Sequence, residues 1–360
     1  MRHAFLLASS ALLVSSLVAA GPACSSTTPS VTPSDAASSP PPVGGDGGLP
    51  DVAIPPLPPP PAGSLVVDFG PIKVAPGVER TQCVTKKLGN TRKIHVGRFQ
   101  NRLGDASHHL IVYRVNDTVE QPKPVDCRPF ADTLDPTKGA PIMISQKAED
   151  ELVLPKGVGF AMEANQLVRL EMHYVNASAT EKTVYATSAM VPMNEADLKD
   201  EADFLFVGNP DIRLPPRSKT TLGPTFLKLP ESHTGVNFFA LTGHEHSLGT
   251  DVKVAVAPDK TGAGTPVYDV PGWLWNEPKT VVHDPPFTVP PGGGFRFSCS
   301  YDNVTDKQVG FGESAGNEMC FFWAYYYPAK GPRVCLHTDQ VPGGLDACCP
   351  GSSVICNMLK

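Results

Sequence analysis

Short apolar runs separated by turn residues recur along most of the chain. Runs rich in Val, Ile, Leu, Phe and Tyr lie at residues 65–69, 93–99, 108–114, 167–175, 204–207, 236–241, 252–256, 295–299 and 321–327. Clusters of Pro and Gly such as 155–157 and 291–294 separate them, as expected of turns between strands. No long segment has the 3.6-residue period of an amphipathic helix, and 194–203 is the best candidate for a short helix or linker. The pattern predicts an all-β fold.

The part of the chain with these runs is long enough for two domains. From Ser64 onward there are roughly 300 residues, and one domain usually has about 100–200. The charged segment 195–203 marks the boundary between them. We therefore predict two consecutive antiparallel β-sandwich domains, at 64–198 and 199–330, followed by a Cys-rich tail at 331–360.

Composition supports this interpretation and excludes others. The 39 Pro and 32 Gly are about a fifth of the 360 residues, against a usual share of about 12%. Long helices do not tolerate so many breakers, which excludes a helical bundle or coiled coil. The formal net charge of -6 leaves no basic surface for a phosphate backbone, so we expect no nucleic-acid partner. Nine Cys favour an exported protein.

The N-terminus predicts export. A short basic start precedes an apolar run at 4–20, which is short for a membrane-spanning helix and typical of a signal peptide. Because Cys24 follows this run, the segment resembles a bacterial lipoprotein cleavage site, with a signal peptide at 1–23 and lipid attachment at Cys24. The alternative is ordinary cleavage after Ala20 or Ala23. Lipidation leaves eight Cys, an even number that suits disulfides.

The segment after the lipidated Cys is predicted to be a disordered linker, 24–63. Residues 25–63 contain 12 Pro, 6 Ser and 5 Gly, with no Lys, Arg or His. Such a segment cannot bury enough apolar surface to order itself, and it would tether a folded head to a membrane. No other apolar run is long enough to cross a membrane, so we expect membrane contact only through the lipid anchor. We expect a monomer at the bacterial outer membrane, facing the periplasm or the cell surface.

Three tight groups of histidines are the main indication of chemistry. His244 and His246 are two residues apart, so on a strand both rings can reach one metal ion. His108 and His109 are neighbours, which can share an ion only at a bulge or strand end. His173 lies on the more polar face of an alternating run. Taken alone, each group is more typical of surface or half-buried histidines than of metal ligands.

The order of these groups changes that interpretation. The motifs are His-His-Leu-Ile-Val at 108–112, Leu-Pro-Lys-Gly-Val-Gly-Phe at 154–160, Leu-Glu-Met-His-Tyr at 170–174, His-Glu-His-Ser-Leu-Gly at 244–249 and Asn-Glu-Met-Cys at 317–320. In this order and spacing they resemble the copper type II, ascorbate-dependent monooxygenase family, which includes peptidylglycine α-hydroxylating monooxygenase and dopamine β-hydroxylase. Any one motif is weak, but five in series are strong.

The resemblance implies two jelly-roll-like domains with one copper on each, two per chain, facing each other across a solvent-filled cleft. The implied ligands are His108, His109 and His173 for the electron-storing copper, and His244, His246 and Met319 for the oxygen-binding, catalytic copper. The ligand chemistry agrees independently, because two imidazoles with a thioether favour copper, whose Cu(I) state soft sulfur stabilises.

The activity implied is hydroxylation of a C–H bond with O2, with electrons from ascorbate or a similar one-electron reductant. A redox metal is needed because no ordinary side chain activates dioxygen. Two other interpretations stay open. The chain could be a non-catalytic lipoprotein that binds or delivers copper at the cell surface, or a structural or adhesion sandwich with incidental histidines.

The resemblance also implies two disulfides. Cys83 and Cys127 match one pair of family positions, and Cys299 and Cys320 match another. The second bridge would fix the strand next to Met319. In the tail, we expect the adjacent Cys348 and Cys349 each to bond Cys335 or Cys356, with a zinc site as the alternative.

The substrate contacts of the family's peptide enzymes do not carry over. Those members have an Arg where this chain has Thr242, and an Asn and a Tyr where it has Phe321 and Trp323. Arg and polar partners suit a peptide carboxylate, whereas these three residues do not. We therefore predict a more apolar pocket and a small, rather apolar substrate. Glu171 replaces a Gln of the peptide enzyme, two residues before His173.

The remaining histidines and two tryptophans are expected to have structural roles. His95, His233, His283 and His337 lack partners at ligand spacing. Trp273 and Trp275 lie in a stretch rich in Pro and Gly, and we expect them to pack in the core or between the domains, with substrate stacking as the alternative.

Overall fold

The regular structure of the protein consists almost entirely of strands. This computed structural model describes residues 59–130, 138–312, 314 and 316–350. Within them only two short 3-10 turns interrupt the strands, η1 (Glu195–Asp197) and η2 (Glu231–His233), so the all-β prediction is confirmed. Each of the nine predicted apolar runs covers at least half of a strand. The predicted signal peptide and the lipid attachment at Cys24 lie outside the described residues.

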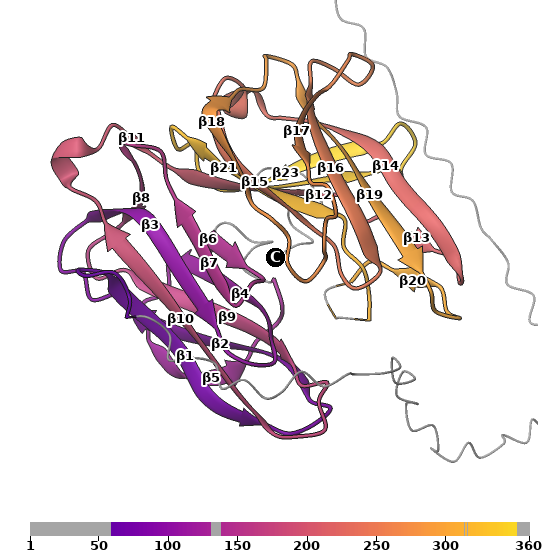
Figure 1. Cartoon of the computed structure of the whole chain (residues 1–360). Helices are drawn as coiled ribbons and strands as arrows, with labels where there is room; N and C mark the ends of the chain where they lie inside the picture. The colour runs from indigo at the N-terminus through magenta and orange to yellow at the C-terminus, as the bar shows by residue number, and fades with distance from the viewer. Residues whose placement is uncertain (1–58, 131–137, 313, 315, 351–360) are drawn as a thin grey trace, which may run out of the picture. The chain divides into compact units, whose positions relative to one another are not determined.

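The first half of the described part contains two sheets (Figure 1). One runs in the order β1 (Leu65–Val74), β10 (Lys182–Pro192), β3 (Ile94–Leu103), β8 (Val158–Met162) and β11 (Asp200–Glu201), with β7 (Glu149–Val153) also paired to β3. The other runs in the order β5 (Gln121–Asp126), β2 (Glu79–Lys87), β9 (Leu167–Val175), β4 (Ser107–Val115) and β6 (Gly139–Ser145).

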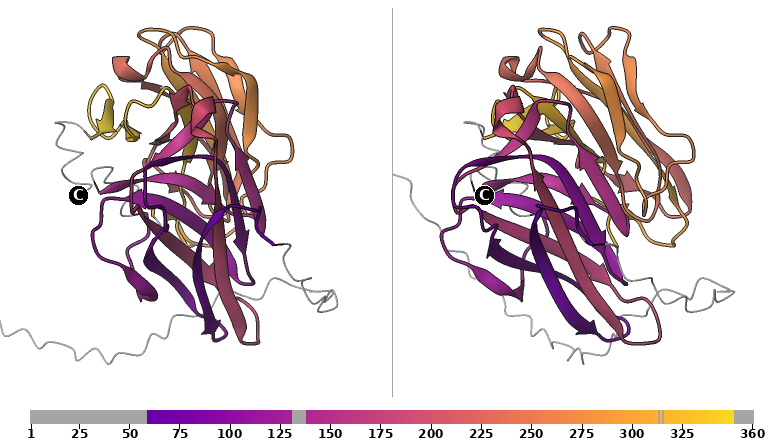
Figure 2. Two further views of the ribbon diagram at one scale, coloured as in Figure 1. Left: turned by 90° about the vertical axis from the view of Figure 1, so that its left-hand side faces the viewer. Right: turned by 60° about the vertical axis from the view of Figure 1, so that its left-hand side comes forward.

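The second half contains two large sheets and a two-stranded ribbon (Figures 1 and 2). The six-stranded sheet runs in the order β18 (Val281–Phe287), β15 (Asn237–His244), β21 (Phe321–Tyr327), β12 (Asp203–Gly208), β22 (Arg333–Thr338) and β23 (Leu345–Cys349). The four-stranded sheet runs in the order β14 (Ser218–Lys228), β19 (Gly294–Asn303), β16 (Gly249–Ala257) and β17 (Thr265–Asp269). The ribbon pairs β13 (Arg213–Leu214) with β20 (Val309–Gly310).

Most pairings are antiparallel, as predicted, but two are parallel. Strand β11 pairs parallel with β8, and β12 pairs parallel with β22. The Cys-rich tail expected to begin at 331 therefore supplies a strand inside the sheet of the second half rather than only a cap.

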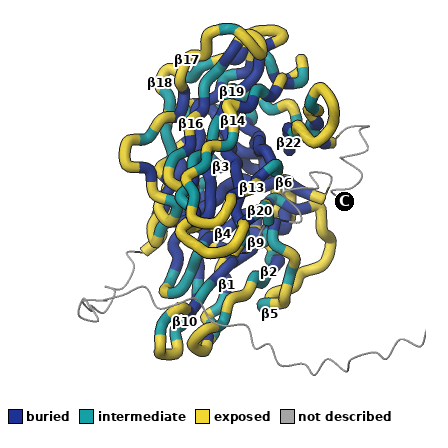
Figure 3. Tube along the Cα trace, turned by 90° about the vertical axis from the view of Figure 1, so that its right-hand side faces the viewer, coloured by how far each residue is buried: buried dark blue, intermediate teal, exposed yellow. Residues whose placement is uncertain are grey.

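The central strands β15, β21 and β12 of the six-stranded sheet in the second half are buried on both faces. Along β12, Phe204 and Phe206 pack in one apolar cluster with the inner residues of the first half, whereas Leu205 and Val207 pack in the cluster inside the second half. Strand β21 alternates in the same way, as Trp323 and Ala324 show. Two-sided burial explains why these strands are continuous apolar runs in the sequence. Burial of each such Phe contributes about 1.5–3 kcal/mol, so the two halves are held together by a shared core, which Figure 3 shows in dark blue.

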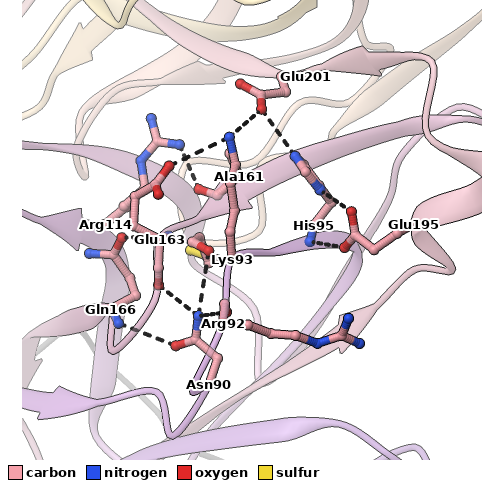
Figure 4. Close-up of polar contacts among 11 residues, drawn as sticks. Asn90, Arg92, Lys93, His95, Arg114, Ala161, Glu163, Gln166, Glu195 and Glu201 are labelled. Atoms are coloured by element: carbon pink, nitrogen blue, oxygen red, sulfur yellow. Dashed lines mark hydrogen bonds and ion pairs between the residues drawn. The ribbon is translucent and has the colours of Figure 1, made fainter.

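The linker between the halves is fixed by a polar cluster at the start of β3 (Figure 4). His95 is 5% exposed, and its Nδ1 lies 2.6 Å from Glu195 Oε2 while its Nε2 lies 3.0 Å from Glu201 Oε1. Lys93 Nζ donates to the same Glu201 oxygen at 2.8 Å. The linker predicted near 194–203 thus contains the single turn η1 and the two-residue strand β11, and carboxylates on both sides of His95 hold it against the first half.

Three disulfides lie within the described residues. Cys83–Cys127 and Cys299–Cys320 form as the family resemblance implied. Cys335–Cys348 realises one of the pairings left open for the tail, and Cys356 lies outside the described residues. In this part of the chain, no helix is long and apolar enough to span a bilayer.

Candidate copper sites and the cavity between them

A bulge in β4 brings three histidines of the first half together. The pairing of β4 with β9 places His109 opposite His173, and the register shifts between Ser107 and His109, so that His108 occupies the bulge. This is the condition under which adjacent histidines can face one ion. The ring centroids of His108 and His109 are 5.3 Å apart, and each lies 5.0 Å from that of His173.

Burial keeps these imidazoles neutral. Desolvation lowers the pKa of His108 to about 3 and that of His109 well below its usual value, and the neighbouring histidines add to both shifts. Burial also lowers the pKa of His173, although the nearby carboxylate of Glu79 opposes this. A neutral imidazole is the form that binds a metal.

Three ring nitrogens of this group are left free for a ligand. Both nitrogens of His109 and Nδ1 of His173 are buried without a hydrogen-bond partner. Nε2 of His173 lies 2.9 Å from Glu79 Oε1, a carboxylate at the start of β2 that is 40% exposed. A carboxylate on the outer nitrogen orients a metal-binding histidine and leaves its other nitrogen as the donor.

The second group forms where β15 ends. His244 is the last residue of that strand, and His246 lies in the following turn rather than on the strand as expected from the two-residue spacing. The two rings are nevertheless 5.2 Å apart. Burial lowers the pKa of His244 well below its usual value and that of His246 to about 4. Nε2 of His244 is buried and unpartnered, whereas Nδ1 of His246 donates to the backbone oxygen of Asn317 at 2.9 Å.

Met319 is held close to this group by its neighbours. It is 1% exposed and lies two residues before Phe321, which pairs with His244 across the strands. The two carboxylate oxygens of Glu318 accept from the backbone N–H groups of His246 at 2.8 Å and Leu248 at 2.7 Å. Glu318 therefore joins the histidine turn to the segment that carries Met319, and the disulfide at Cys320 fixes the same segment from the other side.

The two groups meet instead of facing each other across a wide cleft. The rings of His108 and His246 are 6.3 Å apart, and Phe130 lies between the groups, 5.1 Å from His109 and 6.0 Å from His244. The solvent-filled cleft implied by the resemblance is thus wrong for this structure, because the shared apolar core draws the halves together.

Phe130 is held in place by a buried carboxylate. Its backbone φ of 52° lies in a region that residues other than Gly rarely adopt. Its N–H donates to Glu171 Oε1 at 2.9 Å, and Tyr113 donates to the other carboxylate oxygen at 2.9 Å. Glu171, singled out in the sequence as an ionisable group, thus has the structural task of positioning the ring between the two groups.

A cavity of about 380 Å³ opens beside both groups. The residues that line it are Ala106, Ser107, His108, Gln146, Val175, Ala177, His246, Ser247, Trp275 and Asn276. The ring of Trp275 lies 5.4 Å from that of His108, so this side chain faces the cavity and does not only pack in the core.

The three residues predicted to form the substrate pocket lie elsewhere. Thr242, Phe321 and Trp323 are each no more than 2% exposed, and none of them lines this cavity. Thr242 pairs with Thr280 through their hydroxyls at 2.8 Å, while the two aromatic rings belong to the core shared by the halves.

The donors present fit copper, although they do not close around an ion as they stand. Among the described residues, no three or more His, Cys, Asp or Glu side chains are arranged to hold a metal ion. The fit rests on the buried, neutral imidazoles with unpartnered nitrogens and on the buried thioether of Met319, which lies in the segment that Glu318 joins to the histidine turn. Sequence reasoning missed the outer partners Glu79 and Gln146, because they are distant in the sequence and no motif marks them.

Comparison with known families agrees with the geometry of the second half. Residues 203–341 match the family described as copper type II ascorbate-dependent monooxygenase, C-terminal domain. The match starts at the first residue of β12 and contains His244, His246 and Met319. It also extends past β22, in agreement with the place of that strand in the sheet. Residues 203–341 therefore resemble the C-terminal domain of the copper type II ascorbate-dependent monooxygenase family.

Proposed function

We propose that the protein is a copper-dependent monooxygenase that hydroxylates a C–H bond of a small, rather apolar molecule, using O2 and an ascorbate-like reductant. One observation supports this most directly. Two groups of buried, neutral imidazoles with unpartnered nitrogens meet at a cavity of about 380 Å³. The family of residues 203–341 supplies the reaction type.

The residues proposed to hold the two coppers are His108, His109 and His173 in one site, and His244, His246 and Met319 in the other. Copper in these sites supplies the one-electron redox chemistry and the dioxygen activation that side chains lack. Three imidazoles suit either copper oxidation state, whereas the thioether of Met319 favours Cu(I). The two sites thus differ in character, as storage of an electron and reaction with oxygen require.

The chain itself keeps the imidazoles neutral, orients their rings and excludes water from them. Burial keeps the imidazoles unprotonated, so that their lone pairs stay available. Glu79 holds the outer nitrogen of His173, and the backbone oxygen of Asn317 holds that of His246. A ligand that needs no rearrangement of its ring binds its metal more tightly.

The cavity lining favours an uncharged substrate. Apart from its two imidazoles, it presents apolar groups, uncharged polar groups and the ring of Trp275. No Arg or Lys is among the lining residues, so nothing there would recognise the carboxylate of a peptide. A small molecule with an aromatic or aliphatic body and at most one polar end suits this surface.

The decisive experiment measures oxygen incorporation. The chain from residue 59 onward, loaded with copper, would be supplied with ascorbate, ¹⁸O2 and a panel of small aromatic and aliphatic compounds. The proposal expects two coppers per chain and one labelled oxygen in the product, with both lost on exposure to a copper chelator. His283→Gln is a matched control, because this histidine lies away from both groups and contacts the backbone oxygen of Val267.

Each other result has a definite meaning. Two coppers with neither oxygen uptake nor product would favour copper binding or delivery. Absence of copper would refute both functions and leave a structural sandwich.

We further propose that the protein is an exported lipoprotein attached through Cys24. In a bacterial host the full chain should incorporate labelled fatty acid and sediment with membranes, whereas Cys24→Ser should do neither. Labelling of the Ser variant to the same extent would refute lipidation at this residue.

A further inference from the structure

Gln146 connects the two halves at the second histidine group. It follows directly after β6 of the first half and is 7% exposed. Its Oε1 lies 3.1 Å from Nδ1 of His244, a residue of the second half that is 1% exposed. The hydrogen bond therefore crosses the boundary between the halves within a buried environment.

The environment of Gln146 fixes which end of its amide faces the histidine. Nε2 of Gln146 donates to the backbone oxygen of Trp275 at 3.5 Å, and a carbonyl oxygen can only accept. The amide oxygen is therefore the atom that faces His244, and Nδ1 of His244 must carry the proton. Nε2 of the same ring, which is buried and has no partner, is left with its lone pair exposed to a ligand.

The neighbouring histidine is oriented differently. Nδ1 of His246 donates to the backbone oxygen of Asn317, which belongs to the same half. Its ring is thus held by its own half alone. His244 depends on a side chain that the other half supplies.

We propose that Gln146 is a positioning residue that fixes His244 in the tautomer whose Nε2 serves the second copper site, so that this site is complete only where the two halves meet. The inference rests on the proposed function of that site. Because Gln146 also lines the cavity, a substrate bound there contacts the same amide that orients His244.

The first test uses metal-free protein. Long-range ¹H–¹⁵N spectra of protein labelled with ¹⁵N-histidine report which ring nitrogen of His244 is protonated, and His244→Gln assigns the signal. The parent should show Nδ1 protonated. Gln146→Leu, which keeps the bulk and removes the acceptor, should give a mixture of tautomers. Gln146→Glu keeps an acceptor oxygen and should restore the parent spectrum.

The matched control is Asn276→Leu, which removes another uncharged amide that lines the same cavity. It should leave the His244 tautomer unchanged. If Gln146→Leu fails to fold, Gln146→Asn, one methylene shorter, replaces it, because it withdraws the oxygen while keeping the amide. Parent-like protonation of His244 in every Gln146 variant would overturn the proposal.

The second test measures copper affinity by competition with a chelator. Gln146→Leu should weaken the second site by roughly 10- to 100-fold and leave the first site unchanged, the usual cost of losing an outer partner. An equal loss in Asn276→Leu would overturn the proposal. If the parent binds no copper, the proposed function fails, while the tautomer measurement still decides the role of Gln146.

Discussion

The two halves of the protein share two backbone features, but different groups hydrogen-bond their histidines. In each half a Gly-Pro pair interrupts an edge strand at a register shift, at Gly70 in β1 and at Gly223 in β14. In each half an Asn-x-Ser/Thr turn follows a strand or ends it, at Asn176 after β9 and at Asn303 at the end of β19. Both Asn side chains are buried, and each donates to the backbone oxygen four residues ahead and to a backbone oxygen of another strand.

The difference lies in the groups that orient the imidazoles. A charged, partly exposed carboxylate, Glu79, holds His173 in the first half. Neutral and buried groups hold the second pair, namely the amide of Gln146 for His244 and a backbone oxygen for His246. A carboxylate raises the basicity of its histidine, and a neutral partner does so less. A common scaffold thus surrounds the two histidine groups with hydrogen-bond partners of different character.

The largest loss of copper and of turnover should follow substitution of the proposed copper ligands themselves. Met319→Ala should remove or weaken only the second copper, and His173→Ala only the first. Each should reduce turnover by more than the roughly 100-fold that loss of an outer partner can cost. Copper per chain and electron paramagnetic resonance check this. Loss of both metals in either variant would show that the sites are not independent.

The next largest effect, on the free energy of unfolding, should come from removing a disulfide. Cys299 and Cys320 are 21 residues apart and Cys83 and Cys127 are 44 apart, so removal of either bridge should cost about 3–4 kcal/mol of unfolding free energy. Paired replacement by Ala and urea unfolding measure this. Only Cys299→Ala with Cys320→Ala should also weaken the second copper, because Cys320 adjoins Met319. Equal copper affinity in both double variants would contradict that link.

Asp203, at the boundary between the halves, should make the stability of the protein depend on pH. Burial raises the pKa of Asp203 to about 6, against the opposing charge of Arg114. Since the unfolded chain ionises at lower pH than the native one, this group lowers native stability as pH rises from about 4 to about 6. Asp203→Asn should therefore be more stable than the parent by about 3 kcal/mol at pH 7.5 and equal to it near pH 3.5. Thermal unfolding across this range checks the sign, and a gain confined to acid would refute it.

The two buried turns provide a matched pair. Asn176→Ala and Asn303→Ala should each cost about 2 kcal/mol, because each leaves buried backbone oxygens without a donor. Equal losses in urea unfolding, with both coppers kept, would confirm that the devices are equivalent. A loss in only one half would show that the scaffolds differ.

The smallest effect should come from the charge of one outer partner. Glu79→Gln keeps an acceptor for His173 but removes the negative charge, and should weaken the first copper by about 10-fold while the second stays unchanged. Glu163→Gln is the control, because this carboxylate contacts Lys93 instead of a histidine group. Chelator competition at both sites would measure the difference, and no change at the first site would contradict the comparison.

The sequence by itself determined nine of the strands and the resemblance of the second half to a copper monooxygenase domain, and it singled out the histidines that the structure brings together. Period-two and continuous apolar runs report strand burial directly, so nine runs sufficed to predict the fold class. The strands that were not predicted, such as β2, β5 and β14, are more polar or contain Pro, because one face or one edge meets solvent.

Only the tertiary structure decided how the two sites relate. Two contacts join residues 98 or more positions apart, namely that of His108 with His246 and the hydrogen bond between Gln146 and His244. The place of Phe130 between the groups depends on the direction of its ring, which no local sequence pattern fixes. The predicted pocket residues Phe321 and Trp323 are apolar enough for a pocket or a core, and the packing of β21 against the first half placed them in the core. Local sequence specifies which residues are buried, whereas the packing of whole sheets determines which buried residues meet.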